Sequence, residues 1–87
     1  MNTTRELLAA VKRRHHLTSD YQLGKFLGIS AQRISKYMSG NVTLGDEAAM
    51  TVADALGIER GRVLAIVASE RARSDQAKRE WLKLAGS

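Results

Sequence analysis

Residues 19–40 read SDYQLGKFLGISAQRISKYMSG and predict two short helices joined by a tight turn. Ser19, followed three residues later by Gln22, has the spacing of a capping box, so the first helix is expected to begin here. It should end at Gly28, because glycine readily takes the left-handed conformation that closes a helix. The stretch therefore has the pattern of a helix-turn-helix, in which a short turn containing glycine joins two helices.

The second helix of this stretch is predicted from Ala31 to about Ser39, with Ser30 as its N-cap and Gly40 just beyond its end. Gly24 is expected where the two helices cross closely, since a larger side chain would push them apart. Apolar residues at helical spacing predict which side of the pair faces the core. They are Leu23, Phe26, Leu27, Ile29, Ile34, Tyr37 and Met38.

The rest of the chain also predicts short helices, because its apolar residues recur at helical rather than alternating spacing. Helices are expected from Thr3 to near His15, from Asp46 to Leu56, from Arg60 to Arg73 and from Ser74 onward, with a loop at residues 41–45. Their core-facing residues should be Leu7, Leu8, Val11, Ala49, Val52, Ala53, Leu56, Ile58, Val63, Leu64, Val67 and Ala68, with Ala77, Trp81 and Leu84 aligned on the last helix. The predicted fold class is all-α, a compact bundle of five to six short helices.

The composition limits the classes of protein to which the chain can belong. Its 87 residues suit one domain rather than two, so residues 1–87 are predicted to form a single domain. The chain has no cysteine, which excludes disulfides and thiolate metal sites, and no apolar run long enough to cross a membrane. No signal-peptide pattern opens the sequence, so we expect a soluble cytoplasmic protein.

Positive charge is concentrated in the first half of the chain. Residues 1–45 carry seven Lys and Arg against two Asp and Glu, a net charge of +5, whereas residues 46–87 carry seven of each. A positive half suits a polyanion such as nucleic acid, because neutralised phosphates supply most of the non-specific affinity for DNA. On charge alone, an ordinary solvated surface is the alternative.

The predicted helix-turn-helix resembles that of the phage Cro and repressor class. The resemblance rests on two small-residue positions, Gly24 and Gly28, and on the ending Ile34-Ser-Lys-Tyr37. The segment Leu56-Gly57-Ile58 is similar to the turn that closes the fourth helix of that class, so the likeness spans roughly residues 3–68. The resemblance implies a lambda-repressor-like DNA-binding domain.

The C-terminal part of the chain is similar to a narrower group, the small regulators encoded by phages and prophages. The similarity lies in the segment Ala68-Ser-Glu-Arg-Ala-Arg-Ser-Asp and in the later Trp81. Because the expected bundle is complete before Trp81, this side chain adds apolar area that one small core does not need. With Ile66 and Leu82 it predicts a dimer interface, and about residues 60–85 then form a dimerisation extension. Folding back onto the core of the same protomer is the alternative.

The resemblance also implies that the second helix of the motif lies in the major groove and that residues at the edges of the motif contact phosphates. The candidates for base contacts are Ser30, Ala31, Gln32, Arg33, Ser35 and Lys36. Gln32 has the donor and acceptor that adenine needs, Lys36 can donate to guanine, and Ala31 can touch a thymine methyl. Arg33 suits either a base or a phosphate. The candidates for phosphate contacts are Tyr21, Gln22, Lys25, Ser39, Asn41 and Thr43.

These features predict a sequence-specific transcriptional regulator, a phage-type repressor that binds a pseudo-palindromic operator as a homodimer. A regulatory protein that disrupts the dimer is a further expected partner, whereas no membrane, cofactor or metal is expected. The alternative is a protein-interaction module, such as an antitoxin-like or anti-repressor partner, with secondary DNA contact. An enzyme is not expected, since no carboxylate pair or nucleophilic triad is spaced for catalysis. His15 and His16 are adjacent, which prevents them from sharing a metal, and are expected at a solvated helix end.

Overall fold

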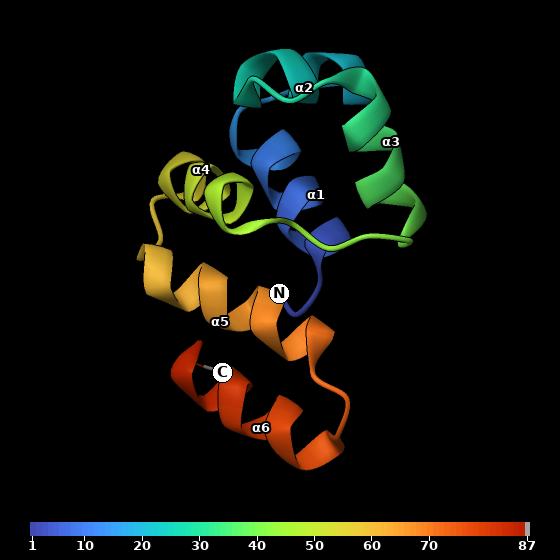
Figure 1. Cartoon of the computed structure of the whole chain (residues 1–87). Coiled ribbons are helices and arrows are strands. Elements are labelled where there is room, and N and C mark those ends of the chain that lie inside the picture. The colour runs from blue at the N-terminus through green and yellow to red at the C-terminus, as the bar shows by residue number, and fades with distance from the viewer. Residues whose placement is uncertain (87) are drawn as a thin grey trace.

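The computed structural model describes residues 1–86, which form six α-helices and no β-strand. The helices are α1 Thr4–Arg14, α2 Asp20–Leu27, α3 Ala31–Ser39, α4 Asp46–Leu56, α5 Arg60–Arg71 and α6 Asp75–Leu84. The predicted all-α class is therefore confirmed. In Figure 1, α2 and α3 lie at one end of the molecule, α5 and α6 lie at the other, and α1 and α4 fill the middle.

Local sequence signals determine where most of the helices begin. Four helices start with a side-chain oxygen that accepts a hydrogen bond from the backbone N–H three residues further on, as N-caps do. The capping residues are Thr3, Ser19, Ser30 and Ser74. α5 differs from its prediction, because it ends at Arg71 rather than at Arg73. Ala72 already has an extended backbone, and Ser74 opens the next helix.

A close crossing joins α2 to α3. Gly28 ends α2 with a φ of 72°, which is the left-handed conformation expected there. The backbone N–H of Ile29 donates to the carbonyl oxygen of Gly24 at 2.9 Å. A Cβ atom on Gly24 would lie 2.6 Å from the carbonyl oxygen of Ile29 and 3.3 Å from Cγ1 of Ile34. The prediction that the helices cross too closely at Gly24 for a side chain is confirmed.

The core lies where α1 and α4 meet the other helices. Its apolar side chains with no exposed surface are Leu7, Leu8, Val11, Leu23, Ile34, Leu44, Ala49, Val52, Ala53 and Val63. Partly buried residues that pack against them include Ile29, Met38, Ile58 and Leu64. All of these except Leu44 were predicted, most of them from helical spacing, and Ile29 and Ile58 from their places just after a glycine that ends a helix. That residue lies in the loop before α4, and a short loop has no periodicity from which a buried side can be predicted.

Phe26 was predicted to face the core but is 48% exposed. α2 has only eight residues, and its buried face is occupied by Leu23, Gly24 and Leu27, which leaves Phe26 on the flank. There the ring packs against the imidazole of His15, with ring centroids 4.4 Å apart. Nε2 of His15 also lies 2.7 Å from a backbone carbonyl oxygen of α4. His15 therefore links three helices, and the prediction of a solvated position for it was wrong.

α5 is buried on more than one side because it lies between α4 and α6 (Figure 1). Its buried residues are Val63, Ala65, Ile66, Val67 and Ser69. Ile66 is only 5% exposed, so its prediction as a dimer-interface residue was wrong: it fills the core of its own protomer. α6 has no buried residue and covers α5 from outside. On α6, Leu82 is half-buried and Trp81 is 42% exposed.

Candidate nucleic-acid interface

α3 has two sides of opposite character. Ile34 and Tyr37 are buried, with 0% and 3% of their surface exposed, and they anchor the helix to the core. The candidates for base contacts are all exposed. They are Ser30, Ala31, Gln32, Arg33, Ser35 and Lys36. The fold therefore brings all six residues together on the accessible surface of one helix.

Two of these six side chains already have partners in the free protein. Oγ of Ser30 accepts a hydrogen bond from the backbone N–H of Arg33 at 3.2 Å, which is its N-cap role. Nη2 of Arg33 donates to the hydroxyl of Tyr37 at 2.7 Å, and the guanidinium carbon lies 5.7 Å from the ring centroid. Arg33 is thus held along the flank of α3, where it lines a hollow together with Lys36 and Thr43. This position suits contact with a phosphate better than contact with a base edge.

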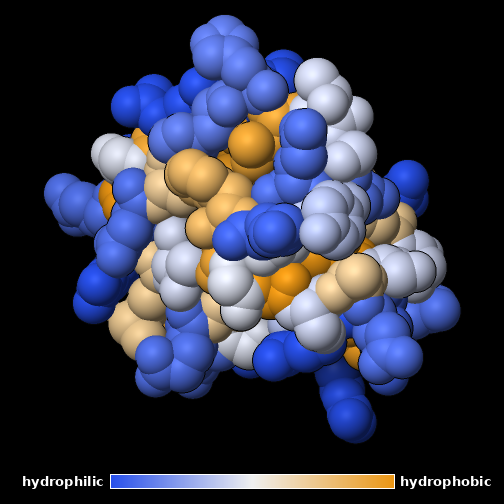
Figure 2. All heavy atoms as spheres, turned by 90° about the horizontal axis from the view of Figure 1, so that it is seen from above, coloured by the Kyte–Doolittle hydropathy of each residue, from blue (hydrophilic) through white to orange (hydrophobic). Residues whose placement is uncertain are grey.

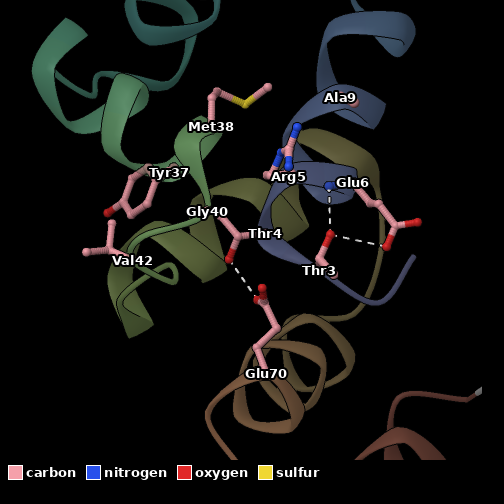
Figure 3. Close-up of a pocket in the computed structure, with 10 residues that line it drawn as sticks. All are labelled: Thr3, Thr4, Arg5, Glu6, Ala9, Tyr37, Met38, Gly40, Val42 and Glu70. Carbon is pink, nitrogen blue, oxygen red and sulfur yellow. Dashed lines mark hydrogen bonds between the residues drawn. The ribbon is translucent and has the colours of Figure 1, made fainter.

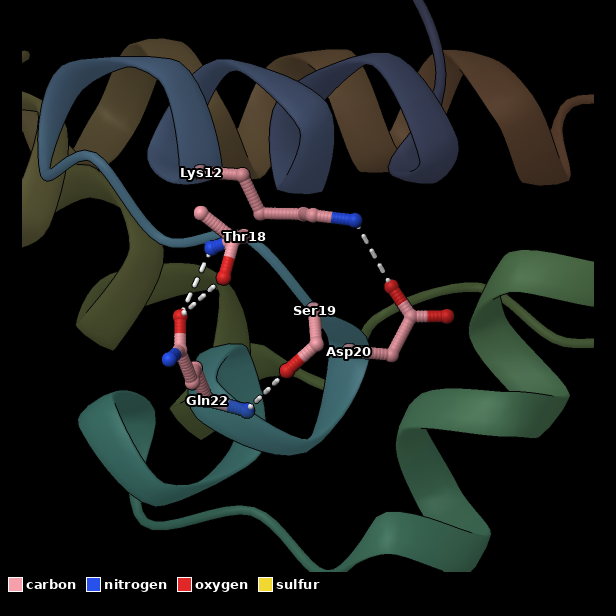
Figure 4. Close-up of polar contacts among 5 residues, drawn as sticks. All are labelled: Lys12, Thr18, Ser19, Asp20 and Gln22. Atoms are coloured by element: carbon pink, nitrogen blue, oxygen red, sulfur yellow. Dashed lines mark hydrogen bonds and ion pairs between the residues drawn. The ribbon is translucent and has the colours of Figure 1, made fainter.

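The side chains around the N-terminus of α2 form a set of hydrogen bonds and an ion pair with one another (Figure 4). Oγ of Ser19 accepts from the backbone N–H of Gln22 at 3.1 Å. Oε1 of Gln22 accepts from the backbone N–H of Thr18 at 2.7 Å and from its hydroxyl at 3.0 Å, one residue earlier than in a standard capping box. The amide nitrogen of Gln22 then points away and can donate to a phosphate. Nζ of Lys12 lies 2.9 Å from Oδ1 of Asp20, so the negative charge at this end is compensated.

Two more candidates for phosphate contact lie on the outer surface of α2. Tyr21 is 64% exposed, and Nζ of Lys25 lies 5.6 Å from the centroid of its ring. A cation held over an exposed ring gains a modest attraction and loses little of its hydration. Tyr21 and Lys25 therefore form a surface pair that presents a hydroxyl and a positive charge to solvent.

The remaining phosphate candidates follow the end of α3. Oγ of Ser39 donates to the carbonyl oxygen of Lys36 at 2.7 Å and lies 3.4 Å from the backbone nitrogen of Asn41, so this hydroxyl is turned back onto its own helix. Asn41 is exposed and Thr43 is half-buried. Nε of Arg71 donates to Oγ1 of Thr43 at 2.9 Å. Sequence reasoning missed Arg71, because it is distant in sequence and no local pattern connects it with the loop.

The end of the molecule that carries α2 is mainly polar. Figure 2 views this end from above and shows hydrophilic side chains around most of the rim, with apolar atoms exposed in patches between them. Phe26 accounts for part of the exposed apolar surface of α2. A surface of this composition suits a hydrated, charged partner, because DNA interfaces are more polar than interfaces between proteins.

A hollow of about 570 Å³ lies between the first turn of α1 and the end of α3 (Figure 3). Its rim carries the carboxylate of Glu6, which accepts hydrogen bonds from the backbone N–H of Asn2 and from the hydroxyl of Thr3, both at 3.1 Å. These two hydrogen bonds lower the pKa of Glu6. The hollow therefore carries charges of both signs, since Arg5 also lines it together with Glu6 and Glu70.

A groove of about 630 Å³ lies where α6 meets α4 and α5, at the other end of the molecule. Its apolar lining comes from Met50, Leu64, Ala65, Ala68, Trp81 and Leu84. Leu84 is 68% exposed, and two carboxylates from the first turn of α4, those of Asp46 and Glu47, complete the lining. Of the three residues predicted for a dimer interface, only Trp81 lines this groove. Leu84 was not predicted for the interface, although its helical spacing from Trp81 in the sequence could have indicated that both residues line the same groove.

Other kinds of site find little support in residues 1–86. No three His, Asp or Glu side chains gather there in a way that could hold a metal ion. In the same residues, no helix combines the length and apolar character that crossing a membrane requires. No family model, curated protein or solved structure matches this chain, so its function must be inferred from its own surfaces.

Proposed function

We propose that the protein is a sequence-specific DNA-binding transcriptional regulator that reads double-stranded DNA with the exposed side of α3. The observation that carries this proposal is the division of α3 into a buried anchor, Ile34 and Tyr37, and six exposed small or polar side chains. A rigidly held helix with such a surface fits the major groove, which is wide enough to admit it. The α2–α3 pair then acts as a helix-turn-helix.

Base recognition is assigned to the side chains at the middle of this surface. The amide of Gln32 can donate and accept at once, which matches the major-groove edge of adenine. Lys36 can donate to guanine, Ser35 can serve any base, and the methyl of Ala31 can pack on that of thymine. Arg33 is assigned to a phosphate, because its contact with Tyr37 holds it at the flank of the helix.

Phosphate contacts are assigned to the two segments that flank α3. On one side lies the N-terminus of α2 with Gln22, Tyr21 and Lys25, and on the other lies the segment with Ser39, Asn41 and Thr43. Backbone N–H groups at a helix N-terminus favour an anion, and the ion pair with Lys12 partly offsets the charge of Asp20 that would oppose it. Contacts of this kind position a protein on DNA without reading its sequence.

The regulator is proposed to act as a homodimer whose interface is the groove at α6. Trp81 and Leu84 leave an apolar surface exposed in this groove, which suits the core of an interface between two copies. A two-fold axis would present two α3 helices to half-sites about 34 Å apart on a pseudo-palindromic operator. Such a dimer, in the cytoplasm, would repress by occluding a promoter, and a protein that disrupts the dimer would relieve repression.

Selection of binding sites from a pool of random DNA duplexes tests the reading of sequence by α3. Gln32→Ala should lose the preference at one base pair of each half-site, a discrimination of about 1–3 kcal/mol, with little change at other positions. Gln76→Ala is the matched control, because it removes the same amide from an exposed position on α6. Unchanged preference in Gln32→Ala would remove that assignment, and failure of the wild-type chain to select any sequence would refute the proposal.

A second candidate function, a protein-interaction module, is favoured by one observation, the exposed apolar groove beside Trp81. The two candidates differ in what fills it. If the groove joins two copies, Leu84→Ser should shift the chain toward a monomer in sedimentation and weaken its binding to a two-half-site duplex more than to a single half-site. If Leu84→Ser changes neither quantity while the wild-type chain is monomeric, the dimer is wrong and the interaction module becomes the better account.

A further inference from the structure

The loop between α3 and α4 is held by two neighbouring residues at the end of α5. Nε of Arg71 donates to Oγ1 of Thr43 at 2.9 Å, and Nη2 of Arg71 donates to the carbonyl oxygen of Leu44. Oγ1 of Thr4 accepts from the backbone N–H of Leu44 at 3.2 Å and donates to Oε1 of Glu70 at 2.7 Å. Figure 3 shows Glu70 extending from α5 to meet Thr4. The backbone of Leu44 is thus fixed on both sides.

The contacts of Leu44 and Thr4 belong to the core, whereas the contact between Arg71 and Thr43 does not. Leu44 and Thr4 are 0% and 2% exposed, so they already anchor the middle of the loop. Thr43 is half-buried, and 47% of the side chain of Arg71 is exposed. Hydrogen bonds and ion pairs at such exposed positions add little to stability. The contact from Arg71 to Thr43 therefore adds little to the stability of the fold.

The contact between Arg71 and Thr43 does orient one hydroxyl group. A threonine hydroxyl has one hydrogen and two acceptor lone pairs, and Nε–H of Arg71 occupies one of the lone pairs of Thr43. The hydroxyl hydrogen must then point away from the guanidinium, where it is available for donation. The guanidinium is itself held in place, since its other partners are the carbonyl oxygen of Leu44 and Oδ1 of Asp46, which lies 3.9 Å from Nη1.

We propose that Arg71 is a positioning residue for the DNA backbone: it orients the hydroxyl of Thr43, and with it the loop after α3, to donate to a phosphate. The inference rests on the proposed function, because it gives a role to a residue that supports the same surface. The planar fork of arginine can donate to Thr43 and to the backbone of Leu44 together, whereas the single ammonium of lysine cannot reproduce that geometry. α5 thereby takes part in DNA binding without touching a base.

The test measures the affinity of a labelled duplex, carrying the site that the wild-type chain selects, over a range of KCl concentrations. Arg71→Ala should bind about tenfold more weakly at low salt, because one phosphate contact is lost. That contact is made by the neutral hydroxyl of Thr43, so the slope of log affinity against log salt should stay close to that of a variant that loses one cation elsewhere on α5. Arg60→Ala is the matched control: it removes the same charge from the same helix, and the hydrogen bonds of its guanidinium go to Asp54 rather than to the loop. It should bind nearly as the wild type does.

Two further variants separate positioning from charge and from folding. Arg71→Lys keeps the charge but not the fork, so it should bind nearly as weakly as Arg71→Ala. Thr43→Val should weaken binding to a similar extent, and the double variant Arg71→Ala with Thr43→Val should be no weaker than Arg71→Ala, since both changes remove one contact. All affinities are measured well below the melting temperature of each variant, so that unfolding does not contribute.

Three outcomes would overturn the inference while leaving the proposed function in place. They are Arg71→Ala binding like Arg60→Ala, full recovery in Arg71→Lys, and additive losses in the double variant, which would mean that Arg71 binds DNA by itself. A wild-type chain without sequence-selective binding to DNA instead refutes the proposed function, and the inference with it. The wild-type measurement therefore distinguishes the two failures.

Discussion

The α2–α3 pair and the α5–α6 pair are each two short helices, but they use their surfaces in opposite ways. α2 and α3 are both anchored to the core by buried residues, and what they leave exposed is mainly polar. α5 is buried on more than one side, whereas α6 has no buried residue and leaves Trp81 and Leu84 exposed. The first arrangement suits a hydrated polyanion and the second an apolar partner.

The difference between the two pairs also concerns stability. Residues of α2 and α3 lie in the same core as α1 and α4, so a defect there should affect the whole domain. α6 packs chiefly on α5, and a change on its outer edge should cost little. The first two predictions below replace matched residues in the two pairs, and the last concerns the junction of α4 and α5. They are ordered from the largest expected effect to the smallest.

Removal of a large apolar side chain should distinguish the pairs most clearly. Ile34 of α3 has no exposed surface, and Ile34→Ala should lower the free energy of unfolding by about 3 kcal/mol through lost burial and a new cavity. Leu84 of α6 is 68% exposed, and Leu84→Ala should change the free energy of unfolding by less than about 0.5 kcal/mol. Urea denaturation at a concentration low enough to prevent self-association measures both. Equal losses would show that α6 is as much a part of the core as α3.

Addition of a methyl group at a glycine should have opposite effects in the two pairs. Gly24→Ala would place Cβ 2.6 Å from a backbone oxygen, so the close approach of α2 and the turn must open, at a cost of about 2 kcal/mol. Gly61 of α5 has nothing within 4 Å of the same position, and Gly61→Ala should stabilise the helix by about 0.5 kcal/mol. Thermal unfolding followed by circular dichroism shows whether each variant melts at a lower or a higher temperature than the wild type. A stable Gly24→Ala variant would contradict the close crossing.

The features of the α2–α3 pair could be predicted from the sequence better than those of the α5–α6 pair. Helix starts, the turn at Gly28 and the small residue at Gly24 depend on neighbours within a few positions, and their predictions agree with the structure. The exposed side of α3 could be predicted for the same reason, because helical spacing alone separates it from Ile34.

Features that depend on distant parts of the chain could not be predicted in this way. Ile66 looked surplus because a single inward stripe was assumed for α5, and only the presence of α6 on its other side explains its burial. Phe26 was placed inside because helical spacing does not show how narrow the buried face of α2 is. Arg71 reaches Thr43 across 28 positions, which no local pattern can indicate.

The smallest effect is expected from the ion pair that joins the end of α4 to the start of α5. Nε and Nη2 of Arg60 donate to the two carboxylate oxygens of Asp54 at 3.0 and 2.7 Å, and these hydrogen bonds lower the pKa of Asp54. A lowered pKa in the folded state contributes stability above the pKa of the unfolded chain and loses it as pH falls through the folded value. Asp54→Asn should therefore flatten the acidic part of the stability profile, measured as the urea midpoint against pH. Arg60→Ala should flatten it in the same way, and a profile unchanged in both variants would show that the pair does not contribute in solution.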